Sequence, residues 1–215
     1  MERIKSEKYM FSGYCERKEN DLLYLVSTSG TTKNGKLIMV EDRNFLCYLQ
    51  AYINYFAITG SDVIIQQSPV YYDGFAEEVF SVLTVGGTLV LMDSMELKNL
   101  RKIAEIIDKN SVSIFPSTPL MLNEINKLDK LPSVRAFISS GDVLRKKQIS
   151  NIVKNSNVYN MYGVSETTVC ATCNKCSVSD KEIIPIGKEL EGYEIVICDE
   201  PFYMRWESYV EKEKI

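Results

Sequence analysis

The chain has 215 residues, of which 45% are hydrophobic, and its formal net charge at pH 7 is −4. This length and composition allow a buried core and are not typical of disordered or collagen-like chains. Acidic and basic residues are interspersed, so the chain lacks the basic field that drives nucleic-acid binding, and we expect no nucleic-acid partner. No segment approaches the ~20 apolar residues of a membrane span, and no apolar signal core follows the N-terminus, which predicts a cytoplasmic protein without a membrane partner.

Strand-like and helical patterns alternate along most of the chain. We expect strands at 22–26, 62–66, 88–92, 112–115, 134–138 and 158–161. We expect helices at 44–56, 74–83, 97–108, 119–127 and 144–154. Short apolar strands joined through helices predict an α/β fold, with a layered, largely parallel sheet covered by helices on both faces.

Loops that follow the strands are the candidate functional segments, because ligands of parallel sheets bind beyond the carboxyl ends of the strands. Turn-forming residues are concentrated in such loops. We expect five of them to converge on one crevice: 27–36, 68–74, 116–119, 139–142 and 162–166.

The side chains available for catalysis are limited, since the chain contains no histidine. Hydrolase schemes that use an imidazole base are therefore excluded. The six cysteines are expected to be reduced, because no secretion signal precedes them. Cys170, Cys173 and Cys176 have a C-x-x-C-x-x-C spacing that is compatible with a metal or cluster, but no fourth ligand is evident, and metal binding is the minor alternative.

The first loop has the composition of a phosphate-binding loop. Residues 27–36 (STSGTTKNGK) combine glycines and hydroxyls, which offer backbone and side-chain donors, with lysine charge. An ordinary polar turn between two strands is the alternative. The spacing also fits a Walker A loop, but Leu37 stands where that motif requires a Ser or Thr for Mg²⁺. Residues 38–40 moreover predict a strand where a Walker A loop is followed by a helix.

Four motifs in the same order resemble the adenylate-forming (AMP-binding) superfamily. Residues 28–37 resemble its loop Thr-Ser-Gly-Thr-Thr-Gly-x-Pro-Lys-Gly, with Lys33, Gly35 and Leu37 in place of Gly, Pro and Gly. The other motifs resemble Phe-Asp-x-Ser, Asn-x-Tyr-Gly-Pro-Thr-Glu and Pro-x-Gly-Lys, at 72–75, 160–166 and 185–188. The resemblance covers about residues 21–200 and is nearest to the adenylation domains of nonribosomal peptide synthetases.

The resemblance implies that ATP and Mg²⁺ bind at these loops. Donors for the phosphates would come from Thr28, Ser29, Gly30, Thr31, Thr32, Lys36 and Ser165. Adenine would be bound by Gly141, Asn160, Met161, Tyr162 and Gly163. Glu166 would ligate Mg²⁺ while the substrate carboxylate attacks the α-phosphorus and pyrophosphate leaves. The alternatives are a core tyrosine at a strand end for Tyr162, and a helix N-cap with an acidic first turn for Ser165 and Glu166.

The same resemblance implies a pocket for an amino acid. Asp73 would hold the α-ammonium group, whereas its alternative role is helix capping. The side-chain pocket would be lined by Gly74, Glu77, Pro116, Ile138, Ser140, Met161, Val169 and Cys170. Glu77 would favour a substrate with a donor or a positive charge if it faces this pocket, and otherwise it is a solvated helix position.

We divide the chain into four parts on these patterns. The core that binds nucleotide and substrate covers 21–177, between an N-terminal extension over 1–20 and the start of a β subdomain over 178–200. That subdomain is expected because short strands near 183–187 and 194–198 would belong to a different sheet. The tail over 201–215 is unassigned.

We therefore interpret the chain as a partial amino-acid adenylation domain that forms aminoacyl-AMP from ATP and an amino acid or other small carboxylic acid. The family's N-terminal portion, its ribose-binding Asp and its C-terminal subdomain with the catalytic lysine have no counterpart in the sequence. No catalytic residue is thus assigned, and we expect weak or no activity of the chain alone. Uncovered apolar edges favour a complementing chain or a carrier protein as partner. A noncatalytic remnant or binding module and an acyl-CoA synthetase-like acid ligase fragment stay open as alternatives.

Overall fold

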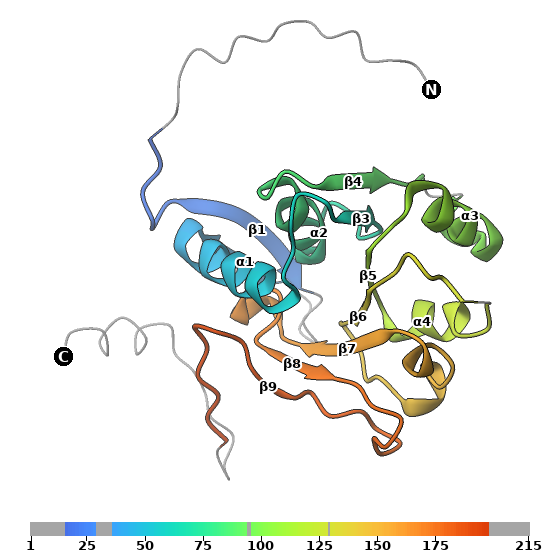
Figure 1. The fold of residues 1–215 in the computed structure, drawn as a ribbon. Helices are drawn as coiled ribbons and strands as arrows, with labels where there is room; N and C mark the ends of the chain where they lie inside the picture. The colour runs from blue at the N-terminus through green and yellow to red at the C-terminus, as the bar shows by residue number, and fades with distance from the viewer. Residues whose placement is uncertain (1–15, 29–35, 94–95, 129, 198–215) are drawn as a thin grey trace, which may run out of the picture.

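The computed structural model describes residues 16–28, 36–93, 96–128 and 130–197 (Figure 1). In these residues a seven-stranded sheet has the order β4-β3-β5-β6-β7-β8-β9, and β1 and β2 form a separate two-stranded sheet. The strands are β1 Leu22–Thr28, β2 Lys36–Glu41, β3 Val63–Gln66, β4 Thr88–Leu91, β5 Ile114–Ser117, β6 Ala136–Ser139, β7 Asn157–Tyr162, β8 Thr172–Lys175 and β9 Lys188–Glu189. The α-helices are α1 Asp42–Phe56, α2 Asp73–Leu83, α3 Leu100–Asn110 and α4 Pro119–Ile125. Single 3₁₀ turns are η1 Glu96–Lys98, η2 Lys146–Gln148, η3 Ile152–Lys154 and η4 Ser165–Thr167.

The seven-stranded sheet separates two hydrophobic cores. Strands β4, β3, β5, β6 and β7 are parallel, whereas β8 and β9 add antiparallel pairs. Alternate strand residues point to opposite faces, so Ile64 and Ile138 pack with α1 and α2 in one core. Phe115 and Phe137 pack with α3 and α4 in the other. The predicted parallel-rich sheet with helices on both faces is confirmed, and Figure 1 shows helices on either side of the strands.

Helix α1 is amphipathic and supplies much of the first core. Its residues Phe45, Tyr48, Leu49, Tyr52 and Phe56 recur at helical spacing and are buried. Adjacent rings along this stripe contact one another, with centroids 5.9 Å apart for Tyr48 and Tyr52. The hydroxyl of Tyr48 thereby reaches the carboxylate of Glu77 on α2, which matters for the site.

The predicted strand at 22–26 is part of a hairpin rather than of the parallel sheet. Strand β1 pairs antiparallel with β2, and Thr28 and Lys36 are register partners at the open end of the ladder. The candidate phosphate loop is therefore the connection of a β-hairpin. The strand predicted at 38–40 lies within β2, so the segment after Lys36 is not the helix that a Walker A loop requires.

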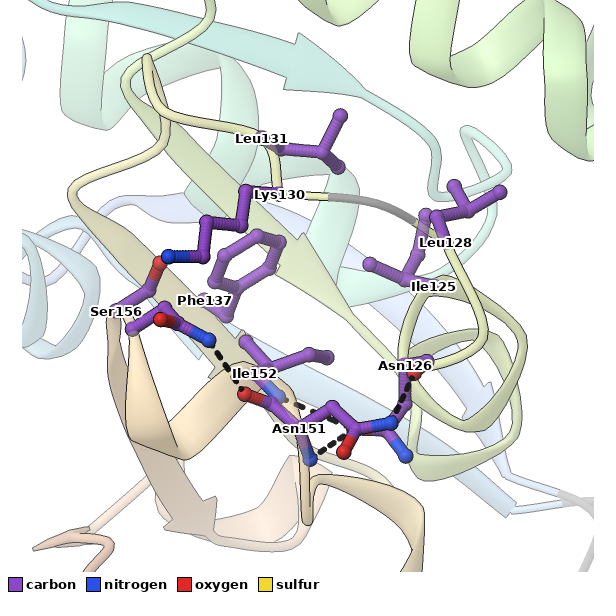
Figure 2. A pocket seen from close by; sticks show the side chains of 10 residues that line it. Ile125, Asn126, Leu128, Lys130, Leu131, Phe137, Asn151, Ile152 and Ser156 are labelled. Atoms are coloured by element: carbon purple, nitrogen blue, oxygen red, sulfur yellow. Dashed lines mark hydrogen bonds between the residues drawn. The ribbon is translucent and has the colours of Figure 1, made fainter.

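The predicted helix at 144–154 is wrong, because this segment contains only the turns η2 and η3. Asn126, at the end of α4, explains the difference. Its Oδ1 accepts hydrogen bonds from the backbone N–H groups of Asn151 and Ile152, at 2.8 and 3.1 Å, as Figure 2 shows. These N–H groups are therefore unavailable for a continuous helical ladder.

The segment after residue 177 was expected to start a separate sheet, but its first strand belongs to the seven-stranded sheet. Strand β9 pairs with β8 at the end of the seven-stranded sheet, and Ile183 forms an isolated bridge with Arg145. Residues 194–197 are not in a strand. The expected strands of a different sheet are thus not found in the described part of this segment, and the division at 178 stays a prediction.

Candidate functional site

The strand register brings the predicted loops to one edge of the sheet. Ser117, Ser139 and Asn160 are partners across β5, β6 and β7. The loops after these strands, together with the loop after β3, therefore begin at the same carboxyl edge. This is the edge at which parallel α/β sheets bind ligands.

The phosphate loop is described only at its two ends. Thr28 and Lys36 are paired across the hairpin, so their side chains start from neighbouring backbone positions. Ser29, Gly30, Thr31 and Thr32 lie outside the described residues, as do the departures at Lys33 and Gly35. Their assignment to phosphate binding stays a prediction.

The loop after β7 places Tyr162 at the surface and Gly163 in a close backbone contact. Tyr162 is 51% exposed, so the alternative of a core tyrosine is wrong. A Cβ at Gly163 would collide with the Cα of Cys170 and the carbonyl oxygen of Val169. The backbone N–H of Ala171 also donates to the carbonyl of Tyr162, at 2.8 Å. Only glycine fits here, and the tight return of the chain leaves the Tyr162 ring facing outward.

Glu166 lies on the single 3₁₀ turn η4 and is exposed. The turn is closed by Thr167, whose N–H and Oγ1 donate to the carbonyl of Val164 at 2.8 and 2.9 Å. Val164, not Ser165, occupies the N-cap position, so the capping alternative for Ser165 is wrong. Within the described residues the Glu166 carboxylate has neither a hydrogen bond nor an ion pair, which leaves its oxygens open to a cation.

The residues after this turn have an unusual backbone. Thr168 and Val169 have φ angles of 62° and 63°, in the left-handed region that β-branched residues rarely adopt. Such a conformation costs on the order of 1–3 kcal/mol per residue and persists only where surrounding contacts enforce it. The chain therefore maintains a strained turn directly beside Glu166.

The remaining predicted adenine residues have three different environments. Gly141 has a φ of 85° with no atom within 4 Å of a built Cβ, so it is a turn glycine in open space. Met161 is buried in the core that contains Ile138. Asn160 is also buried, and its Nδ2 donates to the carbonyls of Ile184 and Pro185, at 3.3 and 2.9 Å. The Asn160 side chain therefore holds the segment before β9 instead of projecting with Tyr162.

Asp73 is the first residue of α2 and is partly exposed. The N-cap position belongs to Tyr72, and the Asp73 carboxylate accepts only from the adjacent N–H of Gly74, at 3.0 Å. A carboxylate in the first turn interacts favourably with the helix dipole. Since no described cation pairs with Asp73, the carboxylate keeps most of its capacity for an ammonium ligand.

Glu77 faces the protein interior, so the alternative of a solvated helix position is wrong. It is 5% exposed and accepts a hydrogen bond from the hydroxyl of Tyr48. Burial raises the pKa of Glu77 to about 8, and the nearby charges of Glu78 and Asp73 act in the same direction, although the Tyr48 hydrogen bond opposes them. Burial therefore favours the neutral form of Glu77, while burial and the Glu77 carboxylate both raise the pKa of the neighbouring Cys170 thiol.

The other predicted pocket residues lie mainly on the face of the sheet on which α2, the helix of Glu77, packs. Ile138, Met161, Val169 and Cys170 belong to the core formed with α1 and α2. Pro116 is the register partner of Ile138 and shares its face. Ser140 and Gly74 are partly exposed. Most of the predicted substrate residues therefore lie on one face of the sheet, the face on which α1 and α2 pack.

Glu78 is a positioning residue that the sequence analysis missed. Its carboxylate is buried and accepts hydrogen bonds from the N–H groups of Gln67 and Ser68 and from Ser68 Oγ, at 2.9, 2.9 and 2.8 Å. These bonds fix the loop that leads from β3 to Asp73. The sequence does show two consecutive acidic residues, Glu77 and Glu78, on a predicted helix that follows a strand. That both are buried could be learned only from the structure.

The cysteine motif is divided between the two cores of the sheet, and only part of it lies near this site. Cys173 packs in the core with Glu77, whereas Cys176 packs in the opposite core, so the C-x-x-C-x-x-C spacing does not gather the thiols on one face. No group of three or more metal-ligating side chains occurs in the described ranges. A cavity of about 50 Å³ lies between α4 and η3, lined in part by Phe137 and Ile152 of that opposite core (Figure 2). No described helix is long and apolar enough to cross a membrane.

Comparison with known proteins identifies the class of protein to which this fold and site belong. The sequence profile of the family described as AMP-binding enzyme matches residues 4–203. The chain is therefore a member of this family, and the predicted membership of the adenylate-forming superfamily is confirmed.

The relatives narrow this class to adenylation domains. Bacitracin synthase 2 of Bacillus licheniformis is 37% identical over 188 residues, which cover 85% of this chain and 7% of that protein. The Vibrio cholerae adenylation domain AlmE, solved with glycyl-adenosine-5'-phosphate, has a TM-score of 0.74 at 25% identity, over 80% of this chain and 34% of that one. The AMPPNP-bound nonribosomal peptide synthetase FmoA3 has a TM-score of 0.72 at 22% identity, over 80% of this chain and 19% of that one, and supports the fold alone.

These matches confirm the predicted likeness to adenylation domains of nonribosomal peptide synthetases. They also show that the chain spans about a third or less of the length of these proteins. The fold shared with them is the mixed, mostly parallel sheet flanked by helices.

Proposed function

We propose that the chain binds ATP with Mg²⁺ and an amino acid at the carboxyl edge of the sheet and takes part in aminoacyl-AMP formation. The observation that carries this proposal is the pair of carboxylates at this edge, Asp73 and Glu166, which have no cationic partner among the described residues. One suits an ammonium group and the other a divalent cation. A nucleotide and an amino acid would supply both.

The nucleotide would lie along the loops after β1 and β7. Thr28, Lys36 and the intervening loop would hold phosphates, and the exposed ring of Tyr162 would lie against adenine. Glu166 fits Mg²⁺ because its open carboxylate is a hard oxygen ligand, and Mg²⁺ is commonly bound through one or two carboxylates plus substrate phosphates. The bound ion would neutralise phosphate charge, while a carboxylate oxygen of the substrate forms a bond to the α-phosphorus and the bond to pyrophosphate breaks.

The substrate would be an amino acid whose side chain carries a hydrogen-bonding or cationic group. Its α-ammonium would pair with Asp73, and its side chain would reach toward Glu77. A largely protonated Glu77 can donate a hydrogen bond as well as accept one. A cationic side chain would favour the carboxylate form of Glu77 and displace its proton.

We expect the chain alone to adenylate weakly and to function with a carrier protein or a complementing chain in the cytoplasm. The chain covers only 7% of the length of bacitracin synthase 2, one of its relatives. Two other functions stay open as alternatives. The departures at Lys33, Gly35 and Leu37 favour a binding module without chemistry. An acid ligase acting on substrates without an amine would not need Asp73.

The first test is calorimetric titration of ATP into the chain with and without Mg²⁺. We expect Mg²⁺ to strengthen ATP binding. With Mg²⁺ present, Glu166→Ala should weaken ATP binding by about 10–100-fold, as expected for the loss of a charged contact. Glu182→Ala is the matched control, since Glu182 is also exposed. Binding that is insensitive to Glu166, or absent from a folded sample, would refute the assignment of the nucleotide site.

A further inference from the structure

Tyr193 lies in a tight turn that is anchored to the main sheet. The N–H of Leu190 donates to the carbonyl of Ala171 at 2.9 Å, and the N–H of Tyr193 donates to the carbonyl of Leu190 at 3.1 Å. Asn54 of α1 also donates to the carboxylate of Glu191, at 3.2 Å. The backbone of this turn is therefore fixed against both β8 and α1.

The Tyr193 hydroxyl reaches from this turn to the backbone beside Glu166. It donates to the carbonyl oxygens of Thr167 and Thr168, at 3.1 and 3.4 Å. Its ring packs against the core that contains Val169 and Cys170. The hydroxyl thus contacts the strained segment at the point where its backbone enters the left-handed region.

We propose that Tyr193 is a positioning residue for the metal-binding turn. Its hydroxyl holds the carbonyls of Thr167 and Thr168, which stabilises the left-handed backbone and fixes the orientation of Glu166. This inference rests on the proposed role of Glu166 in Mg²⁺ binding. The same contact also determines where Val169 enters the predicted substrate pocket.

The Tyr193 contact joins two segments that are far apart in the sequence. Tyr193 is 26 residues from Thr167, so the contact forms only in the folded chain. The bonds within η4, from Thr167 to Val164, close the turn but do not attach it to the rest of the molecule. The Tyr193 hydroxyl attaches the end of this turn to the segment after β9.

The test compares Tyr193→Phe, which keeps the ring, with Tyr159→Phe, which removes the hydroxyl of another partly buried tyrosine packed on the same core. We measure amide hydrogen exchange over 164–171 and ATP binding with and without Mg²⁺. Tyr193→Phe should speed exchange in this segment and weaken Mg²⁺-dependent ATP binding about fivefold, as expected for one hydrogen bond of about 1 kcal/mol. Binding without Mg²⁺ should change less, and Tyr159→Phe should affect neither measurement.

A second substitution separates positioning from general packing. Thr168→Gly removes the steric cost of the left-handed backbone, so adding Tyr193→Phe to it should affect Mg²⁺-dependent binding less than in the wild type. Equal effects in both backgrounds would mean that the hydroxyl does not act through the left-handed backbone at Thr168, which would overturn this part of the positioning role.

The outcomes also separate this inference from the proposed function. If ATP binding is normal but Tyr193→Phe changes neither exchange nor the Mg²⁺ gain, the positioning role is wrong and the function stands. Faster exchange with an unchanged Mg²⁺ gain would likewise refute the link to Glu166. If the wild type binds no ATP, the function fails, and unchanged exchange over 164–171 would refute the contact as well.

Discussion

Buried carboxylates at the two edges of the parallel sheet have different partners, and their pKa values are shifted in opposite directions. At the amino edge, Asp62 accepts hydrogen bonds from Arg135 at 2.8 and 3.0 Å and from Ser113 at 2.7 Å. Burial alone would raise the pKa of Asp62, but these bonds lower it to about 2. At the carboxyl edge, Glu77 has a tyrosine as partner and no described cation, and burial raises its pKa to about 8.

This difference separates carboxylates that are satisfied within the chain from those at the edge where we propose that ligands bind. The amino edge satisfies its charge within the chain, so the Asp62 network needs no other molecule. The carboxyl edge presents Asp73, Glu77 and Glu166 without cations among the described residues, at a position where substrate loops meet. Perturbed carboxylates in such a position are candidates for function.

The largest effect is expected from Asp73→Ala at the carboxyl edge. Loss of a partly buried ion pair with an ammonium group should weaken amino-acid binding by about 100-fold, or about 3 kcal/mol. Calorimetric titration of a panel of amino acids into the ATP-saturated chain measures this loss. Matching carboxylic acids without the amine serve as controls, because their binding should be unchanged. Equal effects on both series would favour a structural role for Asp73, and no effect on either would favour the acid ligase.

Arg135→Met at the amino edge should lower stability without a specific effect on ligand affinity. Asp62 would remain buried with fewer hydrogen-bond donors, which should reduce the free energy of unfolding by about 2 kcal/mol at pH 7. Urea unfolding measures the change, and Arg101→Met, at an exposed position on α3, is the control. A loss of ATP affinity in the folded variant would contradict the division between the edges.

The stability of Arg135→Met should also depend on pH differently from that of the wild type, and the direction of the difference can be predicted. The folded-state pKa of Asp62 is below its unfolded value, so its contribution to stability is present above about pH 3.9 and is lost as pH falls toward 2. Arg135→Met should therefore lose less stability than the wild type between pH 5 and about pH 2. An identical acid limb in both proteins would show that Asp62 is not responsible.

Much of the fold could be predicted from periodicity, because the core strands and helices carry their own apolar patterns. The segment at 144–154 could not, since Asn126 from a different helix binds the N–H groups that a helix would use. Strand β1 was located, but its antiparallel partner shows that an apolar run does not specify the sheet to which it belongs.

The site was predictable as a set of loops but not in its polar contacts. Motif order located Asp73 and Glu166, whereas the inward direction of Glu77 depends on Tyr48 of α1. The Tyr193 contact to Thr167 is likewise a product of tertiary structure. Hydrogen bonds between residues distant in sequence leave no periodic signal, so the sequence could not identify these partners.

The last prediction concerns Glu77→Gln and tests the cause of the raised pKa at this position. Burial raises the pKa of Glu77 in the folded chain to about 8, whereas in the unfolded chain the group ionises near pH 4.3. The unfolded state therefore binds fewer protons between these values, and wild-type stability falls as pH rises through this window. Glutamine cannot ionise, so the variant should lack this fall, and its stability relative to the wild type should rise steadily from pH 5 to pH 8.5.

Urea unfolding of both proteins at pH 5, 7 and 8.5 measures the effect, and Glu105→Gln, at an exposed position, should reproduce the wild-type slope. Parallel curves for the wild type and Glu77→Gln would mean that Glu77 is already ionised in the folded chain at neutral pH. In that case the carboxyl edge would carry a compensated charge like the amino edge, and the contrast between them would disappear. A cationic amino acid that restores wild-type stability at pH 8.5, but has no such effect on Glu77→Gln, would instead identify the missing partner of this carboxylate.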